Sequence, residues 1–168
     1  MNIFVSYSPA DNDLVSAIVS LLTASNDAIV YCDADSIRTS GRWREELEKA
    51  ISEANLVLVF WCHHSNTSYE VRKEFALALE RGKDVLPLLL DGTPLPGKLA
   101  DRRSIDFRGR VEVIHETSPG QAEAGGRADR ADADRQIASG LSRQYEELLV
   151  MGLAREIETE LASRLGTR

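Results

Sequence analysis

Residues 56–61 read Leu-Val-Leu-Val-Phe-Trp, a run in which every side chain is apolar. A strand that is buried on both faces of a parallel sheet has this continuous pattern, whereas a half-exposed strand alternates apolar with polar residues. Similar short runs lie at Asn2–Ser6, Ala28–Cys32, Val85–Leu90 and Ser104–Phe107, so we predict five buried strands in one parallel sheet.

Segments with helical spacing separate these runs, and the first begins at Ser8-Pro9, a cap residue followed by a proline at the first helical position. The apolar stripes are formed by Leu14, Ile18, Leu21 and Leu22, by Trp43, Leu47, Ile51 and Ala54, and by Val71, Phe75, Ala78 and Leu79. Strands that alternate with helices predict a doubly wound α/β fold, flavodoxin-like with strand order 2-1-3-4-5. Such a sheet binds ligands at the carboxyl ends of strands 1 and 3, beside residues 6–8 and 61–68.

One domain is expected, because 168 residues suffice for a single core and are too few for two of ordinary size. Residues 1–109 hold the predicted strands and helices, whereas the composition of residues 110–135 indicates a flexible loop or linker. Residues 136–168 have helical spacing, with apolar positions that change face near Gly152. One face is formed by Ile137, Leu141, Tyr145, Leu148 and Leu149, and the other by Val150, Ile157, Leu161 and Leu165. We expect a helix that closes the domain, then a second helix or kinked continuation whose apolar face needs a partner.

Composition and charge exclude several classes of partner. The net charge is −7 and the Lys and Arg residues form no long run, which argues against a nucleic-acid partner. No secretory signal opens the chain and no segment approaches the run of about 20 apolar residues of a membrane helix, so we expect a cytoplasmic protein without a membrane partner.

Cys32 and Cys62 each end an apolar run, which indicates buried free thiols. The triplet Cys62-His63-His64 contains metal-binding residue types, but three adjacent residues cannot all converge on one ion and no second cluster supplies the remaining ligands. We therefore expect no metal site, and we expect both histidines to face solvent.

The common phosphate-binding loops of this fold are missing from the sequence. A phosphoacceptor domain would need acidic residues after strand 1 and at the end of strand 3, where the chain has Ser6-Tyr7 and Trp61-Cys62. The loop after strand 1 contains no glycine, which argues against a flavodoxin, and there is neither a Gly-x-Gly-x-x-Gly motif nor a Walker loop.

The remaining motifs, in their order and spacing, resemble those of a bacterial TIR domain over about residues 2–109. Ile3–Ser8 resembles the opening strand of that family, and Asp11 and Asp13 its acidic first helix. The other matching stretches are Asp33 through Gly41 to Trp43 for the second strand and BB loop, Leu56–Phe60 for the third strand, Ser68 through Glu74-Phe75 for the third helix, and Lys83–Leu88 for the fourth strand.

This resemblance implies an NAD⁺ glycohydrolase that breaks the nicotinamide–ribose bond, with Glu74 as the catalytic residue. The products would be nicotinamide and ADP-ribose, or a cyclic ADP-ribose product. NAD⁺ is the substrate and no cofactor is expected. We expect substrate contacts from Ser6, Tyr7, Asp33, Ile37, Trp61, Ser68 and Glu70. The implied setting is bacterial immune signalling, including antiviral defence.

Two features leave alternatives open. NAD⁺-cleaving relatives usually carry a tryptophan one turn before the glutamate, where this chain has Glu70. Thr67 and Glu70 have the spacing of a capping box, which gives Glu70 a structural interpretation beside its assignment to the site. Trp61 is equally consistent with substrate stacking and with core packing, while the helical spacing of Trp43 favours the core.

A catalytically silent TIR adaptor that acts by self-association is the alternative function, with the BB loop Asp35–Arg42 as its contact surface. A nucleoside deoxyribosyltransferase, which also uses a glutamate, is a third hypothesis that the motifs favour less. We expect a homo-oligomer formed through the BB loop and the C-terminal helix, because an unpartnered apolar face usually marks an interface. A partner that contains a TIR or effector domain is also consistent with the family.

Overall fold

The computed structural model describes the backbone of residues 1–25, 29–32, 43–111 and 131–165. Its side-chain description leaves out residues 25, 32, 43, 131–143, 145 and 165. The predicted BB loop and most of the predicted linker therefore lie outside the described residues.

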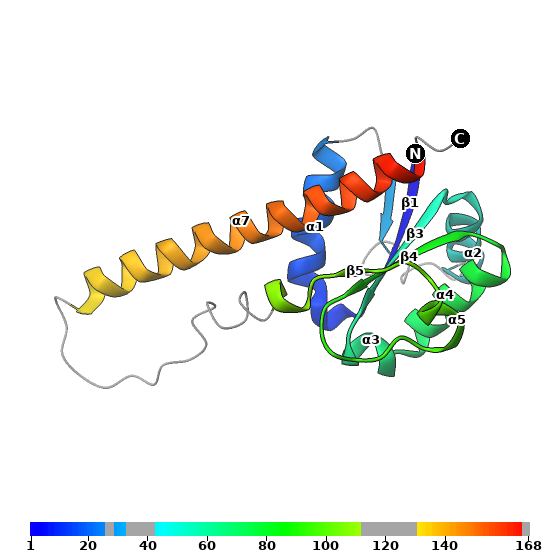
Figure 1. Ribbon diagram of the computed structural model, residues 1–168, viewed down its shortest axis with the longest axis horizontal. Helices are drawn as coiled ribbons and strands as arrows, with labels where there is room; N and C mark the ends of the chain where they lie inside the picture. The colour runs from blue at the N-terminus through cyan, green and yellow to red at the C-terminus, as the bar shows by residue number, and fades with distance from the viewer. Residues whose placement is uncertain (26–28, 33–42, 112–130, 166–168) are drawn as a thin grey trace.

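All five strands form one parallel sheet in the order β2-β1-β3-β4-β5, which confirms the predicted fold (Figure 1). Register is continuous across its centre, where Val5 pairs with Leu58 and Leu58 pairs with Leu86. The strands are β1 (Asn2–Ser6), β2 (Ile29–Cys32), β3 (Leu56–Trp61), β4 (Asp84–Leu89) and β5 (Ile105–Asp106). Every residue of β3 is buried, as its uninterrupted apolar sequence predicts.

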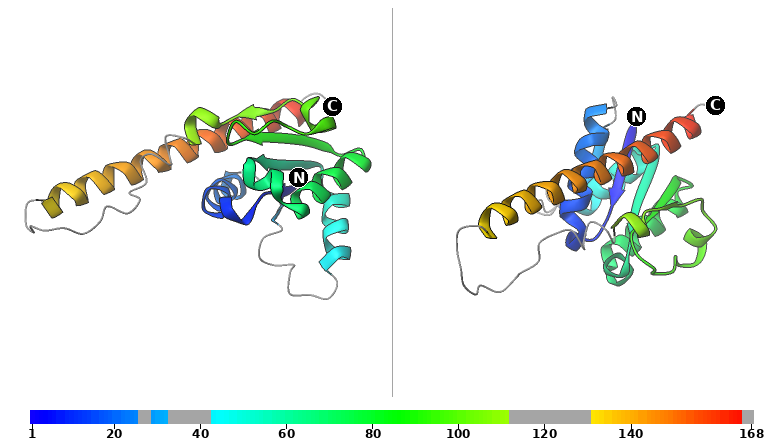
Figure 2. Two further views of the ribbon diagram at one scale, coloured as in Figure 1. Left: turned by 90° about the horizontal axis from the view of Figure 1, so that it is seen from below. Right: turned by 60° about the vertical axis from the view of Figure 1, so that its left-hand side comes forward.

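Helices cover both faces of this sheet. They are η1 (Pro9–Asp11), α1 (Asn12–Ser25), α2 (Trp43–Glu53), α3 (His63–Thr67), α4 (Tyr69–Glu80), α5 (Gly97–Ala100) and α7 (Ala131–Leu165). The helices α1 and α7 pack on one face, and α2, α4 and α5 pack on the other (Figures 1 and 2). Ser8 caps η1 by accepting a hydrogen bond from the Ala10 N–H, and Pro9 is its first residue, as the sequence indicates.

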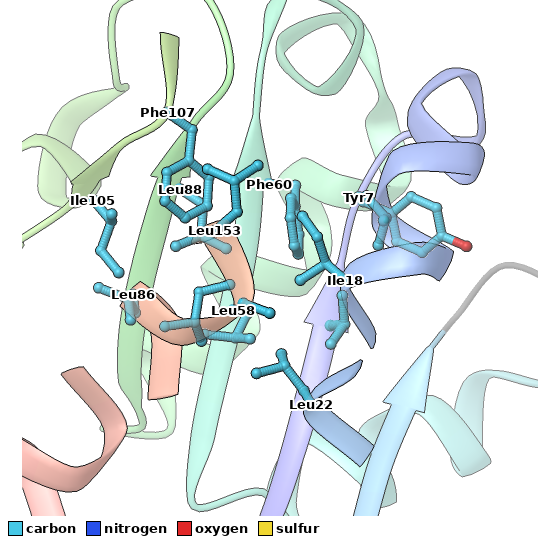
Figure 3. Close-up of a cluster of buried hydrophobic side chains, with 14 of the residues drawn as sticks. Tyr7, Ile18, Leu22, Leu58, Phe60, Leu86, Leu88, Ile105, Phe107 and Leu153 are labelled. Carbon is cyan, nitrogen blue, oxygen red and sulfur yellow. The ribbon is translucent and has the colours of Figure 1, made fainter. Parts of the chain in front are cut away.

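The two faces contain separate cores because successive side chains of a strand point in opposite directions. In β1, Ile3 and Val5 point toward α1 and α7, whereas Phe4 points toward α2 and α4. Figure 3 shows the first of these cores, where Ile18 of α1 and Leu153 of α7 meet Phe60 of the sheet.

The C-terminal segment differs from its prediction in two ways. It is one helix from Ala131 to Leu165, without an interruption at Gly152. The apolar face that was expected to need a partner packs against α1 and the sheet of its own domain, and Ile157 is 0% exposed. The face expected to close the domain is instead exposed at Leu148, whose relative accessibility is 65%. The physical reason is that the α1 face of the sheet is wider than α1 alone can cover, so the second apolar stripe completes that core.

The first half of α7 extends away from the sheet in all three ribbon views, while its second half crosses α1 (Figures 1 and 2). Within the described ranges, no helix combines the length and apolarity that crossing a bilayer requires.

Candidate functional site

The predicted catalytic helix is α4, and its start is fixed by Ser68. The Ser68 backbone is extended and its Oγ accepts a hydrogen bond from the Val71 N–H at 3.3 Å, which satisfies one of the donors left open at a helix N-terminus. Two turns further along, the helix carries Glu74 toward the sheet. The cap therefore sets which residues of α4 face β1 and β3.

Glu74 and Ser6 meet at the carboxyl end of β1. Ser6 follows Phe4 on the α4 face of the strand, and its Oγ donates a 2.6 Å hydrogen bond to Glu74 Oε2. Both side chains are buried, with Glu74 only 2% exposed. At this distance the hydroxyl makes a strong contact with the carboxyl group, and the bond offsets part of the cost of burying that group. The structure thus brings two of the predicted site residues together.

Glu74 is more deeply buried than its sequence pattern indicates. The apolar stripe predicted for this helix consists of Val71, Phe75, Ala78 and Leu79 and does not include Glu74. Val71 and Ala78, three residues before it and four after it, are both buried against the sheet, so Glu74 lies within their stripe. A carboxylate inside an apolar helix face is the exception to ordinary burial, which makes Glu74 the most informative polar residue of this helix.

The predicted capping box is wrong. Thr67 is the last residue of α3, and its Oγ1 donates to the carbonyls of His63 and His64 within that helix. Ser68 takes the cap position, and Glu70 is a half-buried residue of the first turn of α4. A carboxylate in the first turn interacts favourably with the helix dipole, which gives Glu70 a local structural role without a capping box.

Trp61 is a core residue in this structure. It is 0% exposed, its Nε1 donates to the Pro94 carbonyl at 3.2 Å, and its ring packs edge-to-face on Phe75 at a centroid distance of 5.8 Å. No face of the indole is left for a substrate to stack on. Between the two interpretations of its sequence position, the contacts favour core packing; the side chain of Trp43 lies outside the described residues.

Tyr7 is separated from Glu74 by the sheet. The strand alternation that directs Ser6 toward α4 directs Tyr7 into the α1 core, where Figure 3 shows it beside Ile18. Its hydroxyl donates to Asn12 Oδ1 at 2.9 Å. The predicted contacts from Ser6 and Tyr7 therefore point to opposite faces, and in this conformation only Ser6 belongs to the site of Glu74.

The remaining predicted substrate contacts are those of Ser68, Asp33 and Ile37. The Ser68 hydroxyl is engaged in capping α4. Asp33 and Ile37 lie outside the described residues. The observed core of the candidate site is thus the hydrogen-bonded pair Ser6 and Glu74.

A second polar cluster lies at the carboxyl ends of β3 and β4. Cys62 is a buried free thiol, as predicted, and its Sγ donates to Asp11 Oδ2 at 3.0 Å. Burial, followed by this hydrogen bond to a carboxylate, raises the pKa of the Cys62 thiol to about 11. His63 is exposed, as expected, and both its N–H and its Nδ1 lie 2.9 Å from Asp91 Oδ2.

Asp91 is the member of this cluster that the sequence analysis missed. Burial opposes its ionisation, but hydrogen bonds from Thr93 and His63 outweigh that effect and lower the pKa of Asp91 to about 2. The missed signal was positional, because Asp91 follows β4 as Cys62 follows β3, and neighbouring parallel strands end at the same edge of a sheet. The structure thus places one further ligand-type side chain beside Cys62 and His63.

A groove of about 910 Å³ opens beside this second cluster. It runs between α1, the ends of β3 and β4, and the middle of α7, and its lining includes Asp11, Cys62, His63, Asp91 and Met151. Neither Ser6 nor Glu74 lines it, so the two polar clusters face different surroundings.

Comparisons with known proteins agree with this architecture. The family model described as "TIR domain" matches residues 3–117. Among solved structures, the chain resembles the TIR domain of the Toll-related receptor TRR-2 from Hydra magnipapillata, with 16% identity, a TM-score of 0.56, and coverage of 67% of this chain and 89% of that one. It also resembles the TIR domains of the activated Roq1 resistosome, which directly recognises the pathogen effector XopQ, with 16% identity, a TM-score of 0.54, and coverage of 93% and 98%.

A third similar structure is a 2-deoxyribosyltransferase from Leishmania mexicana, with 13% identity, coverage of 82% and 96%, and a TM-score of 0.45, which is too low to support an argument. The comparison with curated proteins gave no match. The structural likenesses establish the fold, and the family model extends over more than half of the sequence. The chain therefore belongs to the TIR domain family.

Proposed function

We propose that this TIR domain is an NAD⁺ glycohydrolase in which Glu74 is the catalytic residue. The observation that carries the proposal is the buried carboxylate of Glu74, held at 2.6 Å by Ser6 at the carboxyl end of β1. That position is the ligand-binding edge of a sheet with this strand order. It is also the helix position at which the resemblance to TIR enzymes places their catalytic glutamate.

One carboxylate is sufficient for this reaction. Nicotinamide in NAD⁺ is a cationic leaving group, so the bond between its ring nitrogen and the ribose C1′ breaks without a general acid, and the electron pair leaves with neutral nicotinamide. Glu74 stabilises the positive charge that develops on the ribose, as glycosidase carboxylates do. Water then adds to C1′ and releases a proton, giving ADP-ribose, or the adenine of the same molecule attacks and gives a cyclic product.

Ser6 fixes the orientation of the carboxylate in this scheme. Its hydrogen bond to Oε2 fixes the orientation of the carboxylate and therefore the position of the second oxygen, Oε1. The bond also limits the rotation of a side chain that otherwise has several rotamers. Since Glu74 is 2% exposed, binding of NAD⁺ has to displace neighbouring side chains at the end of β1.

We further propose that assembly of several copies accompanies activity, in a signalling or immune role. The resistosome neighbour is an assembly that contains TIR domains, which supports this part of the proposal. The packed stripe around Ile157 is already used within the domain, so a contribution of α7 to assembly comes from its projecting half. The predicted BB-loop contact falls on undescribed residues.

The second candidate function is a catalytically silent TIR adaptor. Two observations favour it: Glu70 replaces the tryptophan that NAD⁺-cleaving relatives usually carry, and the buried Trp61 does not take over as a stacking surface. Both functions use the same fold, and fold alone does not choose between them.

Product analysis separates the two functions. Concentrated protein is incubated with NAD⁺, and nicotinamide, ADP-ribose and cyclic products are separated by chromatography, with Glu74→Gln as the comparison. Nicotinamide release that depends on Glu74 supports the glycohydrolase, and concentrated wild-type protein that leaves NAD⁺ intact while still self-associating supports the adaptor.

A further inference from the structure

Three metal-ligating side chains converge beside the groove on the α1 face. Sγ of Cys62, a ring nitrogen of His63 and a carboxylate oxygen of Asp91 all lie within 4.8 Å of one another. They come from two neighbouring strand ends, because Cys62 and His63 follow β3 and Asp91 follows β4. This cluster takes no part in the proposed chemistry of Glu74.

We propose that Cys62, His63 and Asp91 bind a divalent transition-metal ion, of which Zn²⁺ fits the donor set best. Zinc accepts thiolate, imidazole and carboxylate ligands together, whereas Mg²⁺ and Ca²⁺ prefer oxygen ligands alone. One thiolate and one carboxylate neutralise the two positive charges of the ion. Because all three residues line the groove, water from the groove would complete the coordination of the ion.

The contacts among these residues already hold them near the required arrangement. With metal–ligand bonds of about 2.0–2.3 Å, the ligand atoms of a tetrahedral zinc site lie roughly 3.5 Å apart. Cys62 is fixed by burial and by its hydrogen bond to Asp11, while the exposed side chain of His63 can rotate by the ångström or so that closure needs. The 2.9 Å contact between His63 Nδ1 and Asp91 Oδ2 shows that these two groups already meet.

The charge of the groove favours a cation. The described residues that line it include Asp13, Glu146 and Glu147 beside the ligands, and none of the lining residues is Lys or Arg. On binding, the thiol of Cys62 loses its proton to solvent and the sulfur bonds to the metal. The Asp11 carboxylate, 3.0 Å from Sγ, then adds its negative charge next to the ion.

A cysteine–histidine–aspartate hydrolytic triad would use the same residue types, but the contacts do not fit one. In such a triad the thiol contacts the imidazole that removes its proton. Here Cys62 Sγ forms hydrogen bonds with Asp11 and Ser65, and His63 is directed at Asp91. A thiol that faces a carboxylate is placed for a cation rather than for nucleophilic attack.

Cobalt(II) titration of the full chain tests the proposal, because Co²⁺ replaces Zn²⁺ in such sites and a thiolate ligand gives it a charge-transfer band in the near ultraviolet. The protein is first stripped with a chelator, and Zn²⁺ is then added to displace Co²⁺. We expect the band to appear with one Co²⁺ per chain and to disappear on addition of Zn²⁺. Cys32→Ser serves as the background, so that any thiolate signal belongs to Cys62.

Variants assign the ligands. Asp91→Asn and His63→Ala should each weaken Co²⁺ binding by at least about tenfold, and Cys62→Ser should abolish the band. His64→Ala and Asp13→Asn are the matched controls, since both residues line the groove without belonging to the three ligands, and they should bind as wild type does. Circular dichroism of each variant shows that it is folded, and Asp91→Asn keeps the test valid if Cys62→Ser does not fold.

Three results would overturn the proposal. The first is the absence of a thiolate band in folded protein saturated with Co²⁺. The second is binding that His63→Ala and His64→Ala weaken equally, which would indicate a histidine pair on the surface. The third is binding that the folded Asp91→Asn variant leaves unchanged. None of these readouts depends on NAD⁺ cleavage, so the proposal about Glu74 stands or fails separately.

Discussion

Ser6 Oγ and Glu74 Oε2 are 2.6 Å apart although 68 residues separate them along the chain. The bond joins the end of β1 to the second turn of α4, and both of its members are buried. Strand alternation directs Ser6 toward α4, and the phase of α4 directs Glu74 toward β1. The hydroxyl and the carboxylate meet only because both conditions hold. The first two predictions depend on this pair.

Glu74→Gln should lower NAD⁺ cleavage by at least about 100-fold, because an amide lacks the charge that stabilises a cationic transition state. Glutamine has nearly the same shape and can still accept the Ser6 hydrogen bond, so the thermal unfolding midpoint should change by only a few degrees. Glu70→Gln is the matched control on the same helix and should retain substantial activity. Comparable turnover by the folded Glu74 variant would remove Glu74 from the mechanism.

Ser6→Ala should reduce kcat more than it raises KM, because Ser6 positions Glu74 rather than binding substrate. Loss of a hydrogen bond to a charged group should also lower the free energy of unfolding by about 1.5–3 kcal/mol. Urea denaturation measures the second effect and steady-state kinetics on the folded variant the first. Ser16→Ala, on the exposed side of α1, controls for loss of a hydroxyl; wild-type kcat in Ser6→Ala would show that the bond is purely structural.

Trp61→Ala should destabilise the domain by about 3–5 kcal/mol, the usual cost of removing a buried large aromatic side chain. Its indole is fully enclosed between Phe75 and the Pro94 carbonyl, so we expect loss of folded protein rather than loss of a substrate contact. Trp61→Phe should recover part of the stability. A Trp61→Ala protein that unfolds at the wild-type temperature but binds NAD⁺ poorly would restore the stacking role.

Ile157→Ala and Leu148→Ala form a matched pair on α7. Ile157 is 0% exposed and should cost about 2–5 kcal/mol of unfolding free energy, whereas Leu148 is 65% exposed and should cost little. Chemical denaturation of the two variants measures the difference. Equal destabilisation would mean that the two halves of the helix are anchored alike.

Specific activity should rise with protein concentration if assembly completes the site, since mass action fills the assembled state. Leu148→Glu combined with Met151→Glu places charge on exposed apolar positions of α7 and should shift the rise to higher concentration. Light scattering in parallel with product analysis measures both quantities. A monomer at every concentration, with constant activity per chain, is the contrary result.

The sheet could be predicted from the sequence because burial on both faces leaves an unambiguous mark. Leu56 to Trp61 contains no polar residue, and the structure buries all six side chains. The same pattern could not distinguish core packing from substrate stacking for Trp61, because a tryptophan at the end of a strand has the same sequence context in both cases. That distinction depends on Phe75 and Pro94, which reach it from other elements.

The polar site was predictable only in part. The family resemblance singled out Glu74, but its burial depends on how closely α4 packs on β1 and β3. Because the short helix α3 ends at Thr67, the cap of α4 is Ser68 and not Thr67. The local sequence does not distinguish the two positions, since both residues have hydroxyl side chains. Asp91 lies close to Cys62 because the two residues follow neighbouring strands at the same edge of the sheet. Their spacing in the sequence does not reveal this proximity.

Because α7 packs on the α1 face of the sheet, the core on that face cannot be completed until α7 has been synthesised. Ile3 and Val5 leave the ribosome well before Ile157 and Leu161, with which they share a core. Until those late residues emerge, the apolar surface of α1 and of the strands beside it has only part of its cover. A chain that stops before α7 therefore offers chaperones and proteases an apolar sheet face that α7 would otherwise cover.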